Sequence, residues 1–155
     1  MGIEISAETP LQDDVRAMVA QLNAHMIPLT PREFQFQLTV EQMAEPSVTC
    51  LVARDAAGQP VGMASLKDHG GGLGEVKRMF TLPQVRGQRV GSQLLQRIEA
   101  LARDKAITRL VLETGEAPGF EPAWRVYERG GFQVCSAVLD YPDSGYSRFY
   151  EKKIA

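Results

Sequence analysis

At 155 residues, the chain has the length of one domain and can bury a core without disulfides or bound metal. Its 44% hydrophobic and 23% charged residues are typical of globular proteins, which excludes a disordered chain and a fibre. The net charge of −2 predicts no broad basic field for nucleic acid, and no apolar stretch is long enough to span a membrane. No repeat or linker interrupts the sequence, so we expect a single domain over residues 1–155.

The cysteines and histidines show no spacing typical of metal ligands. Cys50 and Cys135 each lie in a strand-like apolar run, and His25 and His69 are scattered elsewhere in the chain. Without a signal peptide, the two cysteines are interpreted as reduced core thiols. We therefore expect a cytoplasmic protein with no bound metal.

The N-terminal part is predicted to form a strand and two helices. Residues 3–7 alternate as a strand does, and Thr9–Gln12 has the pattern of a capping box with a proline at the first helical position. Apolar residues then recur at helical spacing: Leu11, Val15, Met18, Val19, Leu22 and Met26. Thr30–Glu33 repeats the helix-start signal, so we expect a second, shorter helix to about Met43.

Three strands are predicted next, as an antiparallel meander. Val48–Arg54, Pro60–Lys67 and Gly74–Thr81 are apolar or alternating segments. Turn residues at Asp55–Gly58 and a glycine cluster at Gly70–Gly72 separate them.

The C-terminal half is predicted to alternate helices with strands. One face of a long helix that ends near Lys105 is apolar: Val90, Leu94, Leu95, Ile98, Leu101 and Ala102. The elements after it are a buried strand at Arg109–Thr114, a helix at Glu121–Arg129 that stops at Gly130–Gly131, and strands at 132–139 and 147–153. The order β-α-α-β-β-β-α-β-α-β-β predicts an α/β fold, a mixed sheet with helices on both faces.

The segment Thr81–Ser92 carries the most informative chemistry. A strand ends there, a short loop holds Arg86, Gly87 and Arg89, and a long amphipathic helix begins. Free backbone N–H groups at a helix start attract anions, glycine lets a phosphate approach the backbone, and arginine adds positive charge. These features predict a diphosphate site, and a plain strand-to-helix turn with solvated arginines is the alternative. The loop lacks the Gly-Lys-Ser/Thr of a Walker A motif and the glycine spacing of a dinucleotide fingerprint.

Arg86–Gly91 resembles motif A of the GNAT N-acetyltransferase superfamily: Gln or Arg, two residues, Gly, one residue, then Gly or Ala. Arg89 departs from the motif, because the family usually has its first glycine there. Glu75–Thr81 resembles the family's fourth strand, and Tyr127–Phe132 resembles its Tyr-Glu-Lys-x-Gly-Phe segment. The element order agrees along essentially the whole chain. The resemblance implies a GNAT-like, mostly antiparallel sheet of about seven strands flanked by four helices.

The resemblance implies acetyl-CoA as the acyl donor and an amine of a small molecule or peptide as the acceptor. The pantetheine arm is expected to pair with the main chain of Met79, Phe80 and Thr81, where a backbone N–H would also stabilise the oxyanion. The coenzyme A pyrophosphate is expected on the backbone amides of Arg86, Gly87, Gln88, Arg89, Val90, Gly91 and Ser92.

Two residues receive catalytic roles from the same resemblance. Tyr127 stands at the position of the family's usual general acid, and a phenol suits the protonation of a departing thiolate; a core tyrosine is the alternative. Glu75 is the candidate general base for an ammonium substrate, and an exposed glutamate at a strand edge is its alternative. Four further carboxylates are expected to border the cleft, as a negative rim for a cationic amine or as solvated loop residues: Glu113, Glu116, Asp140 and Asp143.

We expect direct acetyl transfer in a ternary complex, because neither cysteine lies in a motif segment or pairs with a histidine. The alternatives are a catalytically silent acyl-CoA-binding sensor or scaffold on the same fold, and a nucleotide-binding regulator that uses the same loop. A homodimer is compatible with the resemblance, and we expect no nucleic acid or membrane as a partner. The sequence leaves open which amine is acetylated and whether the acyl group is longer than acetyl.

Overall fold

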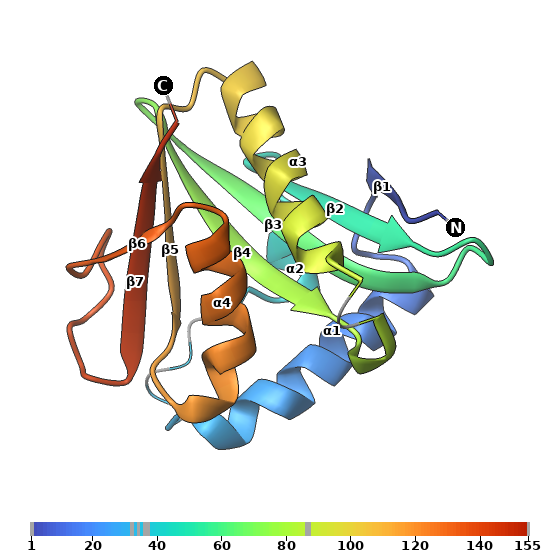
Figure 1. Cartoon of the computed structure of the whole chain (residues 1–155), viewed down its shortest axis with the longest axis horizontal. Coiled ribbons are helices and arrows are strands. Elements are labelled where there is room, and N and C mark those ends of the chain that lie inside the picture. The colour runs from blue at the N-terminus through green and yellow to red at the C-terminus, as the bar shows by residue number, and fades with distance from the viewer. Residues whose placement is uncertain (1, 32, 34, 36–37, 86–87, 155) are drawn as a thin grey trace.

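The computed structural model describes residues 2–31, 33, 35, 38–85 and 88–154. Its centre is a seven-stranded sheet in the order β1-β2-β3-β4-β5-β7-β6 (Figure 1). Neighbouring strands run antiparallel except β4 and β5, which run parallel. The strands are β1 (Glu4–Ala7), β2 (Val48–Arg54), β3 (Pro60–Gly70), β4 (Leu73–Thr81), β5 (Arg109–Gly115), β6 (Gln133–Cys135) and β7 (Ser147–Lys153).

Helices cover both faces of this sheet, and the predicted element order is confirmed (Figure 1). They are α1 (Asp13–Met26), α2 (Val40–Met43), α3 (Val90–Asp104) and α4 (Glu121–Arg129), with short 3-10 turns η1 (Ile27–Leu29), η3 (Pro83–Val85) and η4 (Pro118–Phe120). Alternate residues of each strand pack on opposite helices: Leu51 belongs to the core under α3 and α4, and Val52 to the core under α1 and α2. In the described part of the chain, no helix is long and apolar enough to cross a membrane.

A β-bulge in β4 shapes the middle of the sheet. The register with β3 shifts between Met63 and Ser65, so that two residues, Arg78 and Met79, stand opposite Ala64. Arg78 has a positive φ of 57°, which few residues other than glycine adopt. β4 pairs with β5 only along its first three residues, and a bulge bends and twists the strand that carries it. The ends of β4 and β5 therefore separate.

The predicted capping box at Thr9–Gln12 is wrong. The first helix begins at Asp13, with Gln12 as an N-cap residue whose side chain makes no capping bond. The Gln12 amide instead donates to the carboxylate of Glu8 and the carbonyl of Thr9. The residues before α1 therefore form a turn that connects β1 to the helix.

The predicted second helix is also much shorter than expected. Thr30 is extended, with φ −141° and ψ 140°, as an N-cap residue would be, but Pro31, Gln35 and Leu38 after it are not helical. α2 begins only after Thr39, whose hydroxyl accepts from the Gln42 N–H while the Gln42 side chain accepts from the Thr39 N–H. The capping box at Thr39, rather than the signal at Thr30, starts the helix.

The C-terminal end of α4 is confirmed at the glycine pair, and the strand after it is shorter than predicted. Gly131 has a φ of 91°, and the Phe132 N–H donates to the Tyr127 carbonyl, which closes the helix. β6 then pairs with β7 for only three residues. The chain leaves the sheet because Val138 turns back to pack on its face with Val111 and Phe149.

Candidate active site

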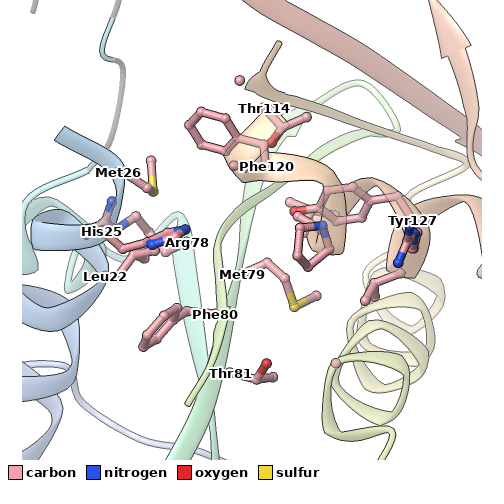
Figure 2. A pocket seen from close by; sticks show the side chains of 18 of the residues that line it. Leu22, His25, Met26, Arg78, Met79, Phe80, Thr81, Thr114, Phe120 and Tyr127 are labelled. Carbon is pink, nitrogen blue, oxygen red and sulfur yellow. The ribbon is translucent and has the colours of Figure 1, made fainter. Parts of the chain in front are cut away.

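A cavity of about 370 Å³ lies where β4 and β5 separate. Figure 2 shows Arg78 and Phe80 on the α1 side of β4, and Met79 and Thr81 on the opposite side. The cavity therefore reaches both faces of the sheet. Its lining includes side chains from the end of α1, the end of β4, η4 and α4: Leu22, His25, Met26, Arg78, Met79, Phe80, Thr81, Phe120, Val126 and Tyr127.

The N-terminus of α3 forms one end of the cavity. Arg89 is its N-cap residue, and Val90 and Gly91 follow as lining residues. No capping bond from a described side chain occupies this helix end, so its first backbone N–H groups can receive an anion. Gly91 also lets α3 approach α4, since a Cβ at this position would lie 3.3 Å from the Val126 side chain.

The structure brings some of the predicted pyrophosphate-binding residues together. Arg89, Val90 and Gly91 line the main cavity, and Ser92 lines an adjoining hollow next to Arg89. Gln88 lines neither, and its N–H donates to the Val85 carbonyl at 3.1 Å. The other two, Arg86 and Gly87, lie outside the described residues.

The end of β4 presents unpaired backbone to the cavity. Met79, Phe80 and Thr81 all line it. On the β3 side, Phe80 and Thr81 pair with Met63 and Gly62, but the described ladder with β5 stops at Glu75. The backbone edge of the segment that faces β5 is therefore available to an extended ligand, as at the edge of any sheet.

Tyr127 is a buried wall residue of the same cavity. Its side chain is 6% exposed, and its ring packs against Phe132 and Tyr150 at centroid distances of 6.1 and 5.7 Å. Burial is the main cause that raises the pKa of the phenol above its ordinary value, so the hydroxyl keeps its hydrogen at neutral pH. Tyr127 thus lies beside the α3 N-terminus and the unpaired edge of β4.

Glu75 lies in a buried polar cluster and does not line the cavity. Its carboxylate accepts from the Tyr141 hydroxyl, lies 3.4 Å from Lys77 Nζ and contacts His69 Nε2 at 2.9 Å. It is only 3% exposed, so the alternative of an exposed strand-edge glutamate is wrong. Burial and the Glu75 charge raise the pKa of Tyr141, which therefore stays a hydrogen donor to the carboxylate.

Known proteins share both the sequence pattern and this architecture. The family model described as "Acetyltransferase (GNAT) family" matches residues 16–132. The chain belongs to the GNAT acetyltransferase family. An IAA acetyltransferase from Azospirillum brasilense is 37% identical over 99% of either chain. A Klebsiella pneumoniae structure assigned as an acyl-CoA N-acyltransferase has a TM-score of 0.83 at 31% identity, over 99% of this chain and 98% of that one. PaiA N-acetyltransferase from Thermoplasma acidophilum, in complex with coenzyme A, shares the fold with a TM-score of 0.71 at 18% identity, over 99% of either chain.

Arg89 is the one departure from the GNAT motif among the described motif residues, and its backbone explains how it fits. Its φ of 60° lies in the left-handed region that glycine adopts without steric cost. An arginine pays conformational energy at this position but places a cationic side chain at the start of α3.

Glu113 is a second carboxylate in the interior of this GNAT domain; it is partly buried and lines the cavity. The Ser147 hydroxyl donates to it at 2.6 Å, and burial is the main cause that raises its pKa. The other three carboxylates expected at the rim, Glu116, Asp140 and Asp143, are exposed or lie outside the lining. The sequence signal for Glu113 is its place directly after the continuous apolar run of β5, where a solvated side chain is unexpected.

Sequence reasoning missed Arg78 as a functional residue. The side chain is 7% exposed, lines the cavity and donates from Nη2 to the Asn23 side chain. A sequence signal for it exists, since two adjacent cations, Lys77 and Arg78, break the alternation expected of a strand. Such a break is typical of a bulge.

The described cysteines lie away from this GNAT site. Cys50 is buried in the core under α1, and Cys135 is half-buried in β6. Neither lines the cavity, and burial raises the pKa of both thiols, which lowers their nucleophilicity. Within the described ranges, no three His, Cys, Asp or Glu side chains group in a way that could hold a metal ion.

Proposed function

We propose that this GNAT protein moves an acetyl group from acetyl-CoA to an amine by direct attack in a ternary complex. The observation that carries the proposal is one cavity that joins the uncapped N-terminus of α3, the unpaired edge of β4 and Tyr127. A solved neighbour with the same fold in complex with coenzyme A supports the choice of donor.

The donor is bound by helix and strand backbone. The N–H groups at the start of α3, together with Arg89, bind the pyrophosphate, because a helix N-terminus and a guanidinium both attract an anion. The free edge of Met79–Thr81 pairs with the pantetheine arm. A backbone N–H of the same segment donates to the thioester oxygen, which becomes negative as the amine nitrogen bonds to the carbonyl carbon.

Tyr127 acts as the general acid that protonates the leaving sulfur. When the tetrahedral intermediate collapses, the C–S bond breaks and the Tyr127 hydroxyl donates its hydrogen to the sulfur. Burial favours the protonated phenol before the step, as the raised pKa indicates. The products are the acetamide and the free thiol of coenzyme A, and solvent returns the proton to Tyr127.

Two carboxylates, the partly buried Glu113 and the buried Glu75, are candidates for the proton acceptor from the amine. Glu113 lines the cavity and accepts a hydrogen bond from the Ser147 hydroxyl, so we assign the role to it. Its raised pKa makes it a stronger base than a solvated glutamate. Glu75 is the alternative, and it would act through Lys77, which contacts its carboxylate and lines the cavity.

Isothermal titration of acetyl-CoA followed by an amine screen tests this function. We expect micromolar binding that Arg89→Glu weakens by about 10-fold or more, while Arg97→Glu, at an exposed position of α3, leaves the affinity within about 2-fold. Release of free coenzyme A thiol when an amine is added would establish that the protein is an acetyltransferase. Binding without turnover over a broad amine panel would favour the silent acyl-CoA sensor, and no binding would overturn both.

Radiolabelled acetyl-CoA tests the direct mechanism. Because neither described cysteine lines the cavity, we expect the label in the product and none on the denatured protein. Label that stays on the denatured chain would contradict direct transfer.

A further inference from the structure

Arg78 is a buried cation whose hydrogen-bonding capacity is mostly unused. Its side chain is 7% exposed, and Nε and Nη1 have no hydrogen-bond partner among the described residues. Only Nη2 donates, to Oδ1 of Asn23 in α1. Burying donors of a charged group without acceptors costs folding free energy, so such a group in a cavity wall requires an explanation.

Among the residues that the structure describes, no carboxylate forms an ion pair with Arg78. Two carboxylates of β4 and β5 contact other groups: the buried Glu75 contacts His69 and Lys77, and the partly buried Glu113 contacts Ser147. None of the ion pairs among the described residues includes Arg78. Burial lowers the pKa of Arg78 to about 10, the change expected when a cation lacks a counter-charge.

The β4 bulge directs this cation to the α1 side of the cavity. Arg78 extends toward α1, where it lies near His25 and Leu22, and Met79 extends to the opposite side (Figure 2). Met79 belongs to the segment proposed to hold the thioester. Arg78 therefore directly precedes a residue of the proposed thioester-binding segment, with its side chain on the other face of the strand.

We infer that Arg78 binds a carboxylate of the acceptor, so that the substrate class is amines that also carry a carboxylate. This inference rests on the proposed acetyl transfer and specifies its acceptor. An unpaired guanidinium is the side chain best suited to a carboxylate, and the same cavity holds one carboxylate of its own, Glu113, to receive the proton of the amine. The unpaired Arg78 guanidinium and the Glu113 carboxylate match the two charges of a zwitterionic amino acid.

The surroundings of Arg78 favour a carboxylate with an apolar body over a phosphate. Leu22, Met26, Phe80 and Phe120 line the cavity on this side. An apolar wall makes the desolvation of a phosphate dianion more costly than that of a carboxylate monoanion, and it stabilises an apolar substituent by burial. We therefore expect apolar amino acids as the best acceptors.

Binding measured without turnover tests the subsite. A panel of apolar amino acids, their amides and their aminophosphonate analogues is titrated into the whole chain saturated with coenzyme A. We expect at least one amino acid to bind about 10-fold or more tightly than its amide in the wild type, and R78Q to abolish this difference. R78K should retain part of it, and R97Q, at the exposed α3 position, all of it.

Three results of the binding measurements would overturn the inference. One is an amide bound as tightly as its acid throughout the panel. Another is that R78Q still binds the amino acid more tightly than its amide. The third is that aminophosphonates bind more tightly than the amino acids, which would assign the site to phosphate. If amines are acetylated but amino acids react no better than their amides, acetyl transfer is supported and the carboxylate subsite at Arg78 is contradicted. If amino acids bind more tightly than their amides but none is acetylated, the subsite is supported and the proposed acetyl transfer is contradicted.

Stability separates a binding role of Arg78 from a structural one. Since R78Q removes an uncompensated buried charge, the ligand-free variant should melt at or above the wild-type temperature. Its affinity for acetyl-CoA should stay within about 2-fold, because the proposed donor contacts lie on α3 and the β4 backbone. A large drop in melting temperature would show that Arg78 supports the fold and would contradict the inference.

Discussion

At the scale of single residues, the Tyr127 hydroxyl can be removed without disturbing its surroundings. Tyr127→Phe keeps the ring that packs between Phe132 and Tyr150, so acetyl-CoA affinity should change little. Loss of the hydrogen donor to the sulfur should lower kcat by about 100-fold. Steady-state kinetics and titration of acetyl-CoA measure the two effects, and Tyr146→Phe, at an exposed tyrosine, is the matched control. An unchanged kcat at saturating substrates would exclude Tyr127 as the acid.

The assignment of the proton acceptor to Glu113 or to Glu75 can be decided from the pH dependence of kcat/KM. If Glu113 accepts the proton, only its ionised form is active, so kcat/KM rises as the pH passes upward through its raised pKa and then levels. Glu113→Gln retains a partner for Ser147 but should lower kcat/KM by about 100-fold and remove this acidic limb. Glu75→Gln should instead keep the limb and lower stability, because Glu75 holds a buried cluster.

Profiles of kcat/KM between about pH 5 and pH 9 for both variants decide the assignment. An acidic limb that disappears in Glu75→Gln and persists in Glu113→Gln would transfer the proton-acceptor role to Glu75. The melting temperature of each variant, measured at the same pH values, separates lost activity from lost structure.

At the scale of elements, the spacing of apolar residues and glycines in the sequence predicts single helices and where they end. The apolar stripe from Val90 to Ala102 predicts α3, and the glycine pair at the end of α4 predicts its stop. The bulge at Arg78 is not predicted, because a bulge depends on how β4 registers with β3, which local spacing does not determine. The false helix start at Thr30 arises because a start signal does not show whether the following residues can propagate a helix.

The C-terminal end of α3 predicts whether glycine at position 106 raises or lowers the free energy of unfolding. Ala106 follows α3 with a φ of 59°, its N–H donates to the Arg103 carbonyl, and the Ile107 N–H donates to the Ala102 carbonyl. This geometry favours glycine, so Ala106→Gly should raise the free energy of unfolding by about 1 kcal/mol. The same change at Ala20, exposed inside α1, should lower it by about 1 kcal/mol.

Urea unfolding of the two variants measures both effects. The changes in the free energy of unfolding must have opposite signs, because both variants replace alanine by glycine and only the backbone conformation of the position differs. Destabilisation by Ala106→Gly would show that the loss of chain entropy outweighs the relief of the left-handed alanine.

At the scale of the whole molecule, the cavity gathers residues that are remote in sequence. Leu22, Arg78, Glu113 and Tyr127 come from α1, β4, β5 and α4. Resemblance to a family pattern is enough to nominate Tyr127 and the start of α3 from the amino-acid sequence. The sequence does not nominate Arg78, and it places Glu113 only among four carboxylates expected to border the cleft. The surroundings of these two side chains arise only when four elements pack together.

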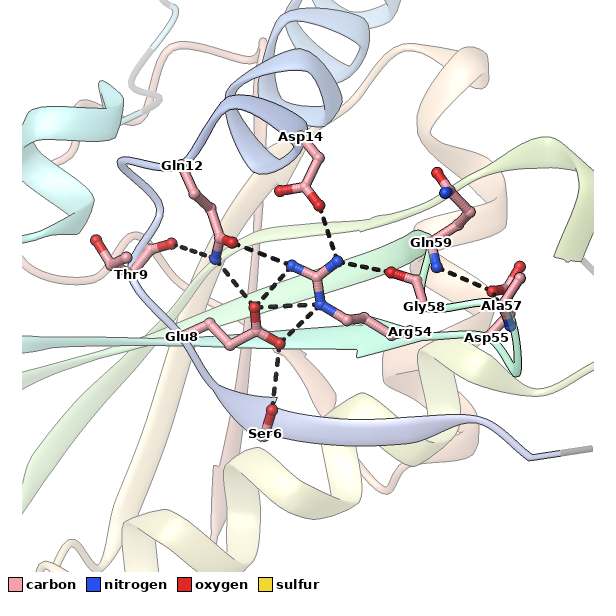
Figure 3. Close-up of polar contacts among 10 residues, drawn as sticks. All are labelled: Ser6, Glu8, Thr9, Gln12, Asp14, Arg54, Asp55, Ala57, Gly58 and Gln59. Atoms are coloured by element: carbon pink, nitrogen blue, oxygen red, sulfur yellow. Dashed lines mark hydrogen bonds and ion pairs between the residues drawn. The ribbon is translucent and has the colours of Figure 1, made fainter.

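A second long-range assembly ties the N-terminal segment to the sheet (Figure 3). Arg54 in β2 contacts both carboxylate oxygens of Glu8, with Nη2 to Oε1 at 2.8 Å and Nε to Oε2 at 3.0 Å. Its Nη1 donates to Asp14 in the first turn of α1 and to the Gly58 carbonyl, each at 2.8 Å. One guanidinium therefore joins the chain before α1, the helix start and the β2–β3 turn.

Replacing Arg54 should destabilise the chain in a pH-dependent manner. The hydrogen bonds from Arg54 are the largest cause that lowers the pKa of Glu8 and of Asp14, whose ordinary values are 4.5 and 3.8. A carboxylate with a lowered folded-state pKa stabilises the fold above its ordinary pKa, and this contribution is lost as the pH falls through the lowered value. Arg54→Met should therefore cost about 1–2 kcal/mol at pH 7, and less below about pH 4.

Urea unfolding of wild type and Arg54→Met at pH 7 and at about pH 3.5 measures this difference directly. Arg16→Met is the control, because Arg16 forms a single exposed pair with Glu41 at 3.4 Å and should cost less than about 0.5 kcal/mol at either pH. A difference between wild type and Arg54→Met that stays constant with pH would mean that Arg54 stabilises the fold through packing of its aliphatic part and not through Glu8 and Asp14. A difference that narrows toward acid would show that these two carboxylates hold the N-terminal segment against the sheet on which the cavity is built.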